Sequence, residues 1–398
     1  MHIGDGDLSD PFSTYRALRT YGPVQRVSTG PDTALWLVTG HEAAPKMAAD
    51  ARLSTDPATI SAAIRERFTK DCGDAEMNAR AGHYTTVLRS FIQHANKAVH
   101  NEFPEGAATE LRDPFERVTH ALLDSFAGTE NSIDLVADFA MPYAVHSVCE
   151  LVGIAEHDRA DVTEWLDLII LSPSRAIERS ASGQLAEKLA ALFTARRVHP
   201  RRDLLSTLSG RISTRTGATE EDVVHGAILL LVVSVETTFS IIGNMFYRLL
   251  TDDVLLDQLR AAPERIPAAV AALLRVNHAQ NISSISCATE PIRIADQRIQ
   301  PGDLVAFTLS DRPPADFGDP HMQQVARCAG GHLAFGYGAH HAFGASYARQ
   351  QAEVALRIVL RRYPNVRLNA RTTELEWLTS PFLRSVRQLP VLLAPTNS

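Results

Sequence analysis

Hydrophobic residues recur at helical spacing over most of residues 79–276. Apolar side chains stand at i, i+3 and i+4 in the segments 132–154, 157–172 and 182–197, which is the pattern of helices with one buried face. The segment that begins near residue 219 is apolar on almost every side, and such a helix belongs in the middle of a large domain. The pattern therefore predicts a bulk of packed helices.

The pattern changes near both ends of the chain. Residues 10–22 predict a helix with Asp10 as N-cap and Gly22 as stop, followed by a short hairpin. Residues of about 280–310 and 365–395 have strand character, and 346–364 predicts a helix that stops at Pro364. We expect one domain over 1–398, mainly α with a small β subdomain.

Composition and charge exclude several classes of function. The chain has 398 residues, 45% of them hydrophobic, and a net charge of −7, so it has no global attraction for nucleic acid. The longest unbroken apolar stretch, 227–233, is too short to span a bilayer. The N-terminus lacks a signal pattern, and the four cysteines lack metal-site spacing. We expect a cytoplasmic protein that binds neither nucleic acid nor membranes.

Several motifs then occur in one order along the chain. Residues 332–349 read HLAFGYGAHHAFGASYAR, 310–320 read SDRPPADFGDP, and an ETT triplet at 236–238 lies in the long apolar helix. With the strands at 284–305, this layout resembles the bacterial cytochromes P-450. The resemblance implies the cytochrome P-450 fold, in which 332–362 would be the former haem loop and the helix that follows it.

The resemblance is broken at the residue that would bind haem iron. The family pattern is F-x-x-G-x-x-x-C-x-G, and here Phe335, Gly338 and Gly344 keep their places while Ala342 takes the place of cysteine. The thiolate of that cysteine ligates the iron and favours O–O cleavage. A methyl group does neither, so we expect no haem-thiolate chemistry.

Other residues that serve haem in the family are also replaced. Arg275 is retained, but Ala272 and Met322 stand where its two partners would be, and Ser286 stands where the family has an arginine. His332 remains as a relic. Because buried carboxylates of haem need cationic partners, we expect the chain to hold no haem and no other cofactor.

Two further histidines, His340 and His341, lie beside the empty ligand position. They are weak candidates for a replacement ligand to haem or to another metal. His340 fills a position where the family often has histidine, and neighbouring histidines point in different directions. We therefore expect no metal site.

Glu236 is a carboxyl group inside an apolar helix. A buried carboxyl has a raised pKa and can act as a general acid or base. With Thr237 beside it, Glu236 could serve non-redox chemistry in the former haem pocket. The favoured interpretation is a structural relic that forms hydrogen bonds at a helix distortion.

The alanine in place of the cysteine leaves two hypotheses for the function of this protein. Some cytochrome P-450 relatives without this cysteine are auxiliary proteins that activate deoxysugar glycosyltransferases of antibiotic pathways. By resemblance we expect a haem-free, non-catalytic partner of a glycosyltransferase. The alternative is a haem-independent enzyme for cyclisation, dehydration or isomerisation of a natural product, and a haem protein with a histidine ligand is a minor alternative. In either class the pocket could hold a small apolar natural product.

Overall fold

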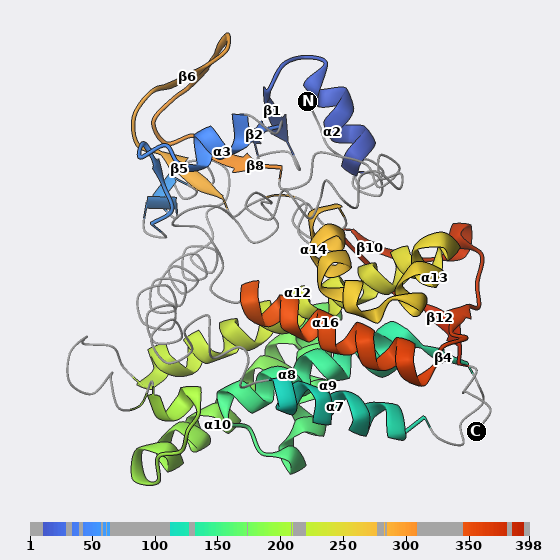
Figure 1. Ribbon diagram of the computed structural model, residues 1–398. Helices are drawn as coiled ribbons and strands as arrows, with labels where there is room; N and C mark the ends of the chain where they lie inside the picture. Colours follow the sequence, from blue (N-terminus) through green and yellow to red (C-terminus); the bar gives the residue numbers. More distant parts are fainter. Residues whose placement is uncertain are drawn as a thin grey trace. The chain divides into compact units, whose positions relative to one another are not determined.

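The computed structural model describes the greater part of the chain (Figure 1). The described residues are 11–28, 34–39, 43–56, 59–60, 62–63, 112–126, 132–172, 174–207, 209, 220–276, 282, 285–308, 345–379 and 384–393. They form two compact units, each of which is described separately. Unit 1 comprises Met1–Arg89, Ala271–Ala342 and Trp377–Ser385, and unit 2 comprises Ser90–Val270, Phe343–Glu376 and Val386–Ser398.

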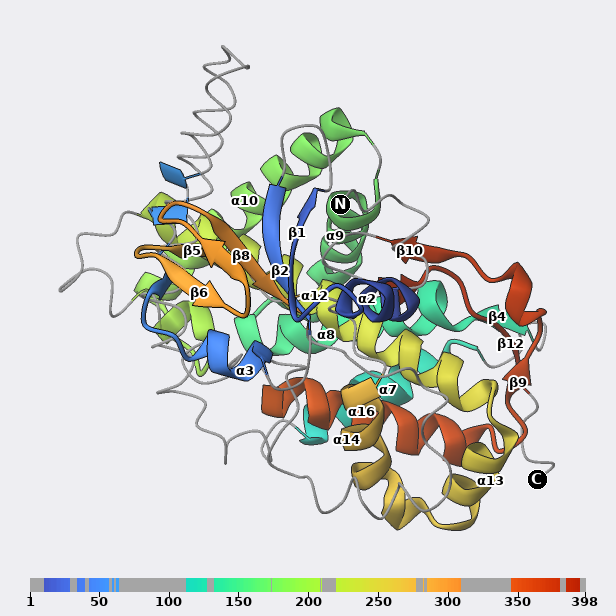
Figure 2. The same ribbon diagram turned by 90° about the horizontal axis from the view of Figure 1, so that it is seen from above.

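Unit 1 is built on a five-stranded sheet. Its elements are α2 (Pro11–Arg19), β1 (Val24–Ser28), β2 (Ala34–Val38), α3 (Ala43–Ala48), β3 (Leu53–Ser54), β5 (Ser286–Ala288), β6 (Ile292–Ile294), β7 (Gln297–Ile299), β8 (Leu304–Phe307) and β10 (Trp377–Thr379). The strand order is β1-β2-β8-β5-β3. β2 and β8 are parallel, and the other neighbouring strands are antiparallel. The hairpin pair β1 and β2 lies side by side in Figure 2.

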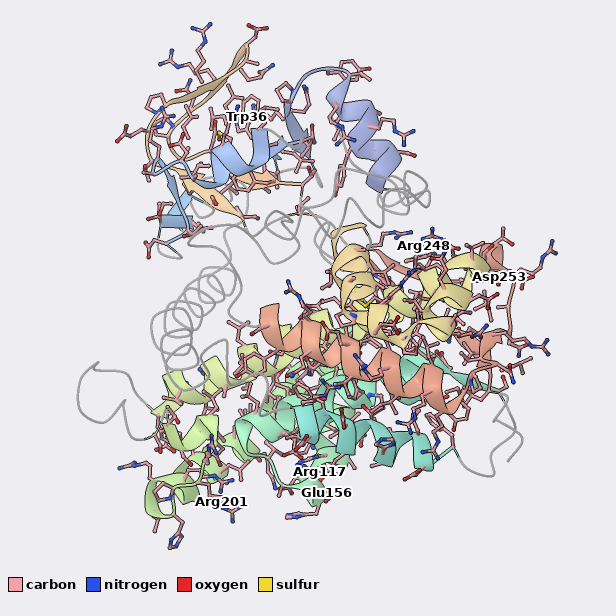
Figure 3. The ribbon with its side chains drawn as sticks, in the orientation of Figure 1. Trp36, Arg117, Glu156, Arg201, Arg248 and Asp253 are labelled. Carbon is pink, nitrogen blue, oxygen red and sulfur yellow. The ribbon has the colours of Figure 1, made fainter. Side chains whose placement is uncertain are left out.

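Local sequence explains why this sheet forms. Leu35 and Leu37 of β2 are buried while Ala34 and Trp36 are only half-buried, which is the two-residue alternation of a half-buried strand. Trp36 of β2, labelled in Figure 3, donates its indole N–H to Asp303 Oδ2 at 2.9 Å, just before β8. Gly22 stands with a φ of +120° after α2, a conformation that glycine adopts without a Cβ clash.

Unit 2 holds the long helices. Its elements are α7 (Arg112–Asp124), β4 (Ser132–Asp134), η3 (Leu135–Ala140), α8 (Met141–Val152), η4 (Glu156–Asp158), α9 (Arg159–Leu171), α10 (Arg175–Val198), α12 (Glu220–Leu250), α13 (Asp253–Ala261), η5 (Pro263–Arg265), α16 (Ala345–Arg362), β9 (Arg367–Leu368), η8 (Thr372–Glu374) and β12 (Pro390–Leu392). The helix α14 (Ile266–Val276) and the strand β11 (Arg384–Val386) each cross from one unit to the other.

The helix α12 forms the core of unit 2. It packs against α8, α9, α10 and α16, and Leu231, Val235 and Leu249 are completely buried. Each fully buried side chain of this size contributes about 1.5–3 kcal/mol. A helix of 31 residues that is apolar on most sides is stable in water only when other helices cover it.

Unit 2 also has a small antiparallel sheet with the strand order β4-β12-β9. A π-helical turn joins this sheet to the helical core. Leu135–Ala140 forms the π-helix η3, directly before α8. Asp134 caps it, because its carboxylate Oδ1 accepts from the backbone N–H of Val136 at 2.9 Å and of Leu389 at 2.9 Å. One side chain therefore fixes both the start of η3 and the segment that leads into β12.

A buried ion pair connects α8, α10 and the segment after α10. Arg196 Nε lies 2.5 Å from Asp203 Oδ2, and its guanidinium also donates to the carbonyl of Gly153 at 2.7 Å. Gly153 has a φ of +94°, and a Cβ there would clash with the Asp203 carboxyl group. Glycine at 153 is therefore required both by the backbone conformation and by the ion pair.

Replacing Asp203 by alanine is expected to destabilise the protein by about 3–5 kcal/mol, because Arg196 would be left as an unpaired buried charge. Urea denaturation measures the change. The control is Glu116→Ala, which removes an exposed partner of Arg112 and is expected to cost less than about 1 kcal/mol. Similar small losses in both variants would contradict the importance of the buried pair.

Most of the elements predicted from the pattern are confirmed. The helices within 132–197, the long helix after 219, the hairpin at 24–38 and the helix before Pro364 all form. The segments 79–111 and 332–344 lie outside the described residues, and the single domain over 1–398 stays a prediction. Within the described part, Leu135–Val152 and Val223–Leu250 could cross a membrane by length and composition, yet 67% and 61% of these segments are buried inside the protein.

Candidate functional site

The polar residues predicted from the long helix lie on its less buried stripe. Glu236 and Thr237 are half-buried, and Val233, one turn before, is 41% exposed. On the opposite side Val235 and Phe239 are fully buried. The helix therefore presents one acid and one hydroxyl group within an apolar stripe that the rest of the protein covers only in part.

Thr237 is held by its own helix. Its hydroxyl donates to the carbonyl of Val233 at 2.7 Å, with a longer contact of 3.3 Å to the carbonyl of Ser234. Such bonds to the preceding turn satisfy the donor and tend to bend a helix slightly. The oxygen keeps its lone pairs, so it can accept a hydrogen bond from a bound molecule.

Burial raises the pKa of Glu236 above the ordinary value of a glutamate. Among the described residues, no charged neighbour adds to this shift, and burial is its cause. A carboxyl group with a raised pKa is protonated at higher pH than usual and can then donate a proton or a hydrogen bond. This is the behaviour that we expected of Glu236. The helix distortion that we expected near Glu236 is not seen, because α12 is one continuous α-helix from Glu220 to Leu250.

Thr238, the next residue, makes a contact that could not be predicted from the sequence. Thr238 is buried, and its hydroxyl donates to the side-chain carbonyl of Gln351 on α16 at 3.3 Å. These residues are 113 positions apart. The contact fixes α12 against α16 one residue away from Thr237. No local pattern marks Gln351, because its role depends on how the two helices pack.

The other predicted site residues are only partly placed. Phe335, Gly338, Ala342, Gly344, His332, His340 and His341 lie outside the described residues, and the same holds for the side chain of Arg275. Ala272 on α14 and Ser286 on β5 are 5% and 2% exposed. Within the described ranges no group of three metal-binding side chains occurs.

The comparisons with known proteins cover nearly the whole chain. The chain is 31% identical over 98% of its length to the cytochrome P-450 monooxygenase PikC of Streptomyces venezuelae, covering 92% of it. It is 32% identical over 96% of its length to 6-deoxyerythronolide B hydroxylase of Saccharopolyspora erythraea, also covering 96% of that protein. No family model matches.

A solved structure confirms the fold. The tirandamycin C-bound monooxygenase TamI matches with a TM-score of 0.81 and 29% identity, over 99% of this chain and 100% of that one. The mainly α architecture with small sheets is therefore the cytochrome P-450 fold, as expected.

The relatives overturn the function expected from the loss of cysteine. They are named as monooxygenases and hydroxylases, which contradicts both the non-catalytic, haem-free glycosyltransferase auxiliary and the haem-independent enzyme. The expectation that haem is absent is wrong for the same reason, because such enzymes depend on haem. The binding of a glycosyltransferase or of a small apolar natural product, and the lack of affinity for nucleic acid and membranes, stay predictions.

A haem group would meet an unusual set of side chains in this chain. Ala342 offers no donor atom to iron. At two described positions where the family has charged residues, Ala272 and Ser286 are buried and neutral. Ligation by a cysteine thiolate at residue 342 does not fit this chain. The short motif around residue 342 predicts that no cysteine binds iron there. The activities named for the relatives are found only by comparing the whole chain.

Replacing Glu236 by glutamine is expected to stabilise the protein at about pH 8 and to change little below about pH 4.5, the ordinary pKa of a glutamate. The raised pKa favours the protonated carboxyl in the folded state, so the wild type loses stability relative to the variant as pH rises. Thermal unfolding over this pH range measures the difference. Glu221→Gln, at an exposed position of the same helix, is the control. A difference that does not depend on pH would contradict the raised pKa.

Proposed function

The chain belongs to the cytochrome P-450 family, and on that premise we propose that it oxidises a natural product of the polyketide class. The observation that carries the proposal is identity above 30% over almost the full length of two enzymes. One of these enzymes is named for its substrate, 6-deoxyerythronolide B. A cytoplasmic location goes with this proposal.

The stripe of α12 around Glu236 supports contact with such a substrate. Val232 and Val233 provide an apolar surface next to Glu236 and Thr237. A binding site for an organic molecule typically combines apolar walls with a few polar groups that fix its orientation. In this proposal the protonated Glu236 donates to a substrate oxygen, and Thr237 accepts from a substrate hydroxyl.

We infer further that this chain is a family member without the haem-ligating cysteine. Phe335, Gly338 and Gly344 set the register of the loop, and this register places Ala342 at the ligand position. Haem, when bound, supplies the redox chemistry of the family, and the thiolate tunes that chemistry. In this chain the iron would have to take its protein ligand from another residue, and His340 and His341 are the neighbouring imidazoles.

The absorption spectrum of the haem tests this inference. We expect wild-type protein produced with a haem precursor to contain haem but to lack the spectral signature of a thiolate ligand after reduction and addition of carbon monoxide. Ala342→Cys is expected to gain that signature, and Ala339→Cys, in the same loop, is expected not to. A thiolate signature in the wild type would contradict the assignment of residue 342, and a wild type without haem would contradict the haem-dependent oxidation.

Turnover tests the proposed oxidation itself. The protein is supplied with an electron-donor system and a panel of macrolide and linear polyketide compounds, and mass spectrometry detects a product heavier by one oxygen atom. Glu236→Ala is expected to lower kcat/KM about tenfold, the effect of losing one hydrogen bond to the substrate, while Glu221→Ala leaves it unchanged. Absence of product across the panel, with PikC active on its own substrate, would overturn the proposal.

A further inference from the structure

Unit 2 contains a groove that is much more basic than the rest of the chain. It has a volume of about 960 Å³ and lies between α7, α13, the start of α14 and the end of α16. Its charged lining consists of five arginines and one glutamate: Arg112, Arg260, Arg357, Arg361, Arg362 and Glu116. The whole chain has a net charge of −7. Five arginines therefore lie close together in a protein whose net charge is negative.

Three of the five arginines have carboxylate partners. Arg112 pairs with Glu116 at 2.9 Å, Arg362 with Asp124 at 2.6 Å and Arg260 with Asp257 at 3.1 Å. Arg260 also donates to the carbonyl of Val366 at 3.0 Å. These contacts hold the three guanidinium groups in place at the groove.

The remaining two arginines lack such partners. Arg357 and Arg361 form no ion pair with the residues that the structure describes. They stand one helical turn apart on α16, and like charges at this spacing destabilise a helix. Glu353, one turn before Arg357, partly compensates, although burial is the main influence on it and raises its pKa. A bound anion would remove the remaining repulsion.

The groove also has an apolar wall. Pro263 and Pro364 line it beside the arginines, over a floor of the buried side chains Leu259, Ile266, Ile358 and Leu360. Its volume falls within the range of sites for organic ligands, about 300–1,000 Å³. Guanidinium groups recognise phosphate oxygens through paired hydrogen bonds. A ligand that suits both parts of the lining combines a phosphate group with an organic group.

We propose that this groove is a binding site for an organic diphosphate, with Arg357 and Arg361 as the residues that hold its phosphate oxygens. The site involves none of the residues placed on the stripe of α12, so it stands independently of the proposed oxidation. His120, which also lines the groove, offers a ring N–H as a further donor to the anion.

Calorimetric titration with inorganic pyrophosphate and with ADP, at constant ionic strength, tests the proposal. We expect both to bind, and ADP to bind more tightly because its organic group covers the apolar wall. Arg361→Gln, at an exposed position that tolerates substitution, and Arg357→Gln are each expected to weaken binding about tenfold, the effect of losing one charge-assisted hydrogen bond.

The matched control is Arg117→Gln. Arg117 is exposed on α7, as labelled in Figure 3, and does not line the groove, so its loss is expected to leave both affinities unchanged. Equal weakening in Arg117→Gln would show that only the overall charge matters and would overturn the site. No binding of either probe, or ADP no tighter than pyrophosphate, would also overturn the proposal.

Discussion

The burial of α12 is the constraint on which unit 2 depends. A helix of 31 residues with apolar side chains on most sides cannot stand exposed to water, because each uncovered large apolar side chain forgoes about 1.5–3 kcal/mol. The helices α8, α9, α10 and α16 cover it. Only the stripe that includes Val233 and Glu236 is less buried, and this is where the chain combines polar groups with an apolar surface.

The close packing around α12 depends on small and polar residues at particular positions. Gly243 lets the helix approach Val136 and Val386, whose methyl carbons would lie 3.2 Å from a Cβ at this position. At the next position, the side chain of Asn244 is buried and accepts from the backbone N–H of Val386 at 3.0 Å. A buried polar group is costly unless it is paired, so this bond fixes the register of the C-terminal segment against the helix.

Much of this fold could be predicted from the sequence, because the signals are local. The apolar run of α12 and the alternation in β2 each reflect burial of that element alone. The contact between Thr238 and Gln351 and the ion pair between Arg196 and Asp203 could not be predicted, since both depend on how separate segments pack. The cluster of arginines around the groove could not be predicted for the same reason, because its members come from α7, α13 and α16. Only Arg357 and Arg361 stand one turn apart on one helix.

Function shows a different limit of sequence reasoning. The expected loss of activity depended on one local signal, the alanine at position 342 of the proposed haem loop. Similarity to monooxygenases runs through nearly the entire chain, and it points to a substrate-binding enzyme rather than to an auxiliary protein. The raised pKa of Glu236 could be expected from the sequence, because a carboxyl group inside an apolar helix is buried.

The central claim is that a polyketide-type molecule binds against the less buried stripe of α12. Photocrosslinking with a macrolide that carries a photoreactive group, followed by peptide mapping, tests it most directly. The account predicts adducts on the peptide that contains Val233 and Glu236, and their loss when unlabelled macrolide is added in excess. Adducts confined to other segments, or adducts that excess macrolide does not displace, would contradict it.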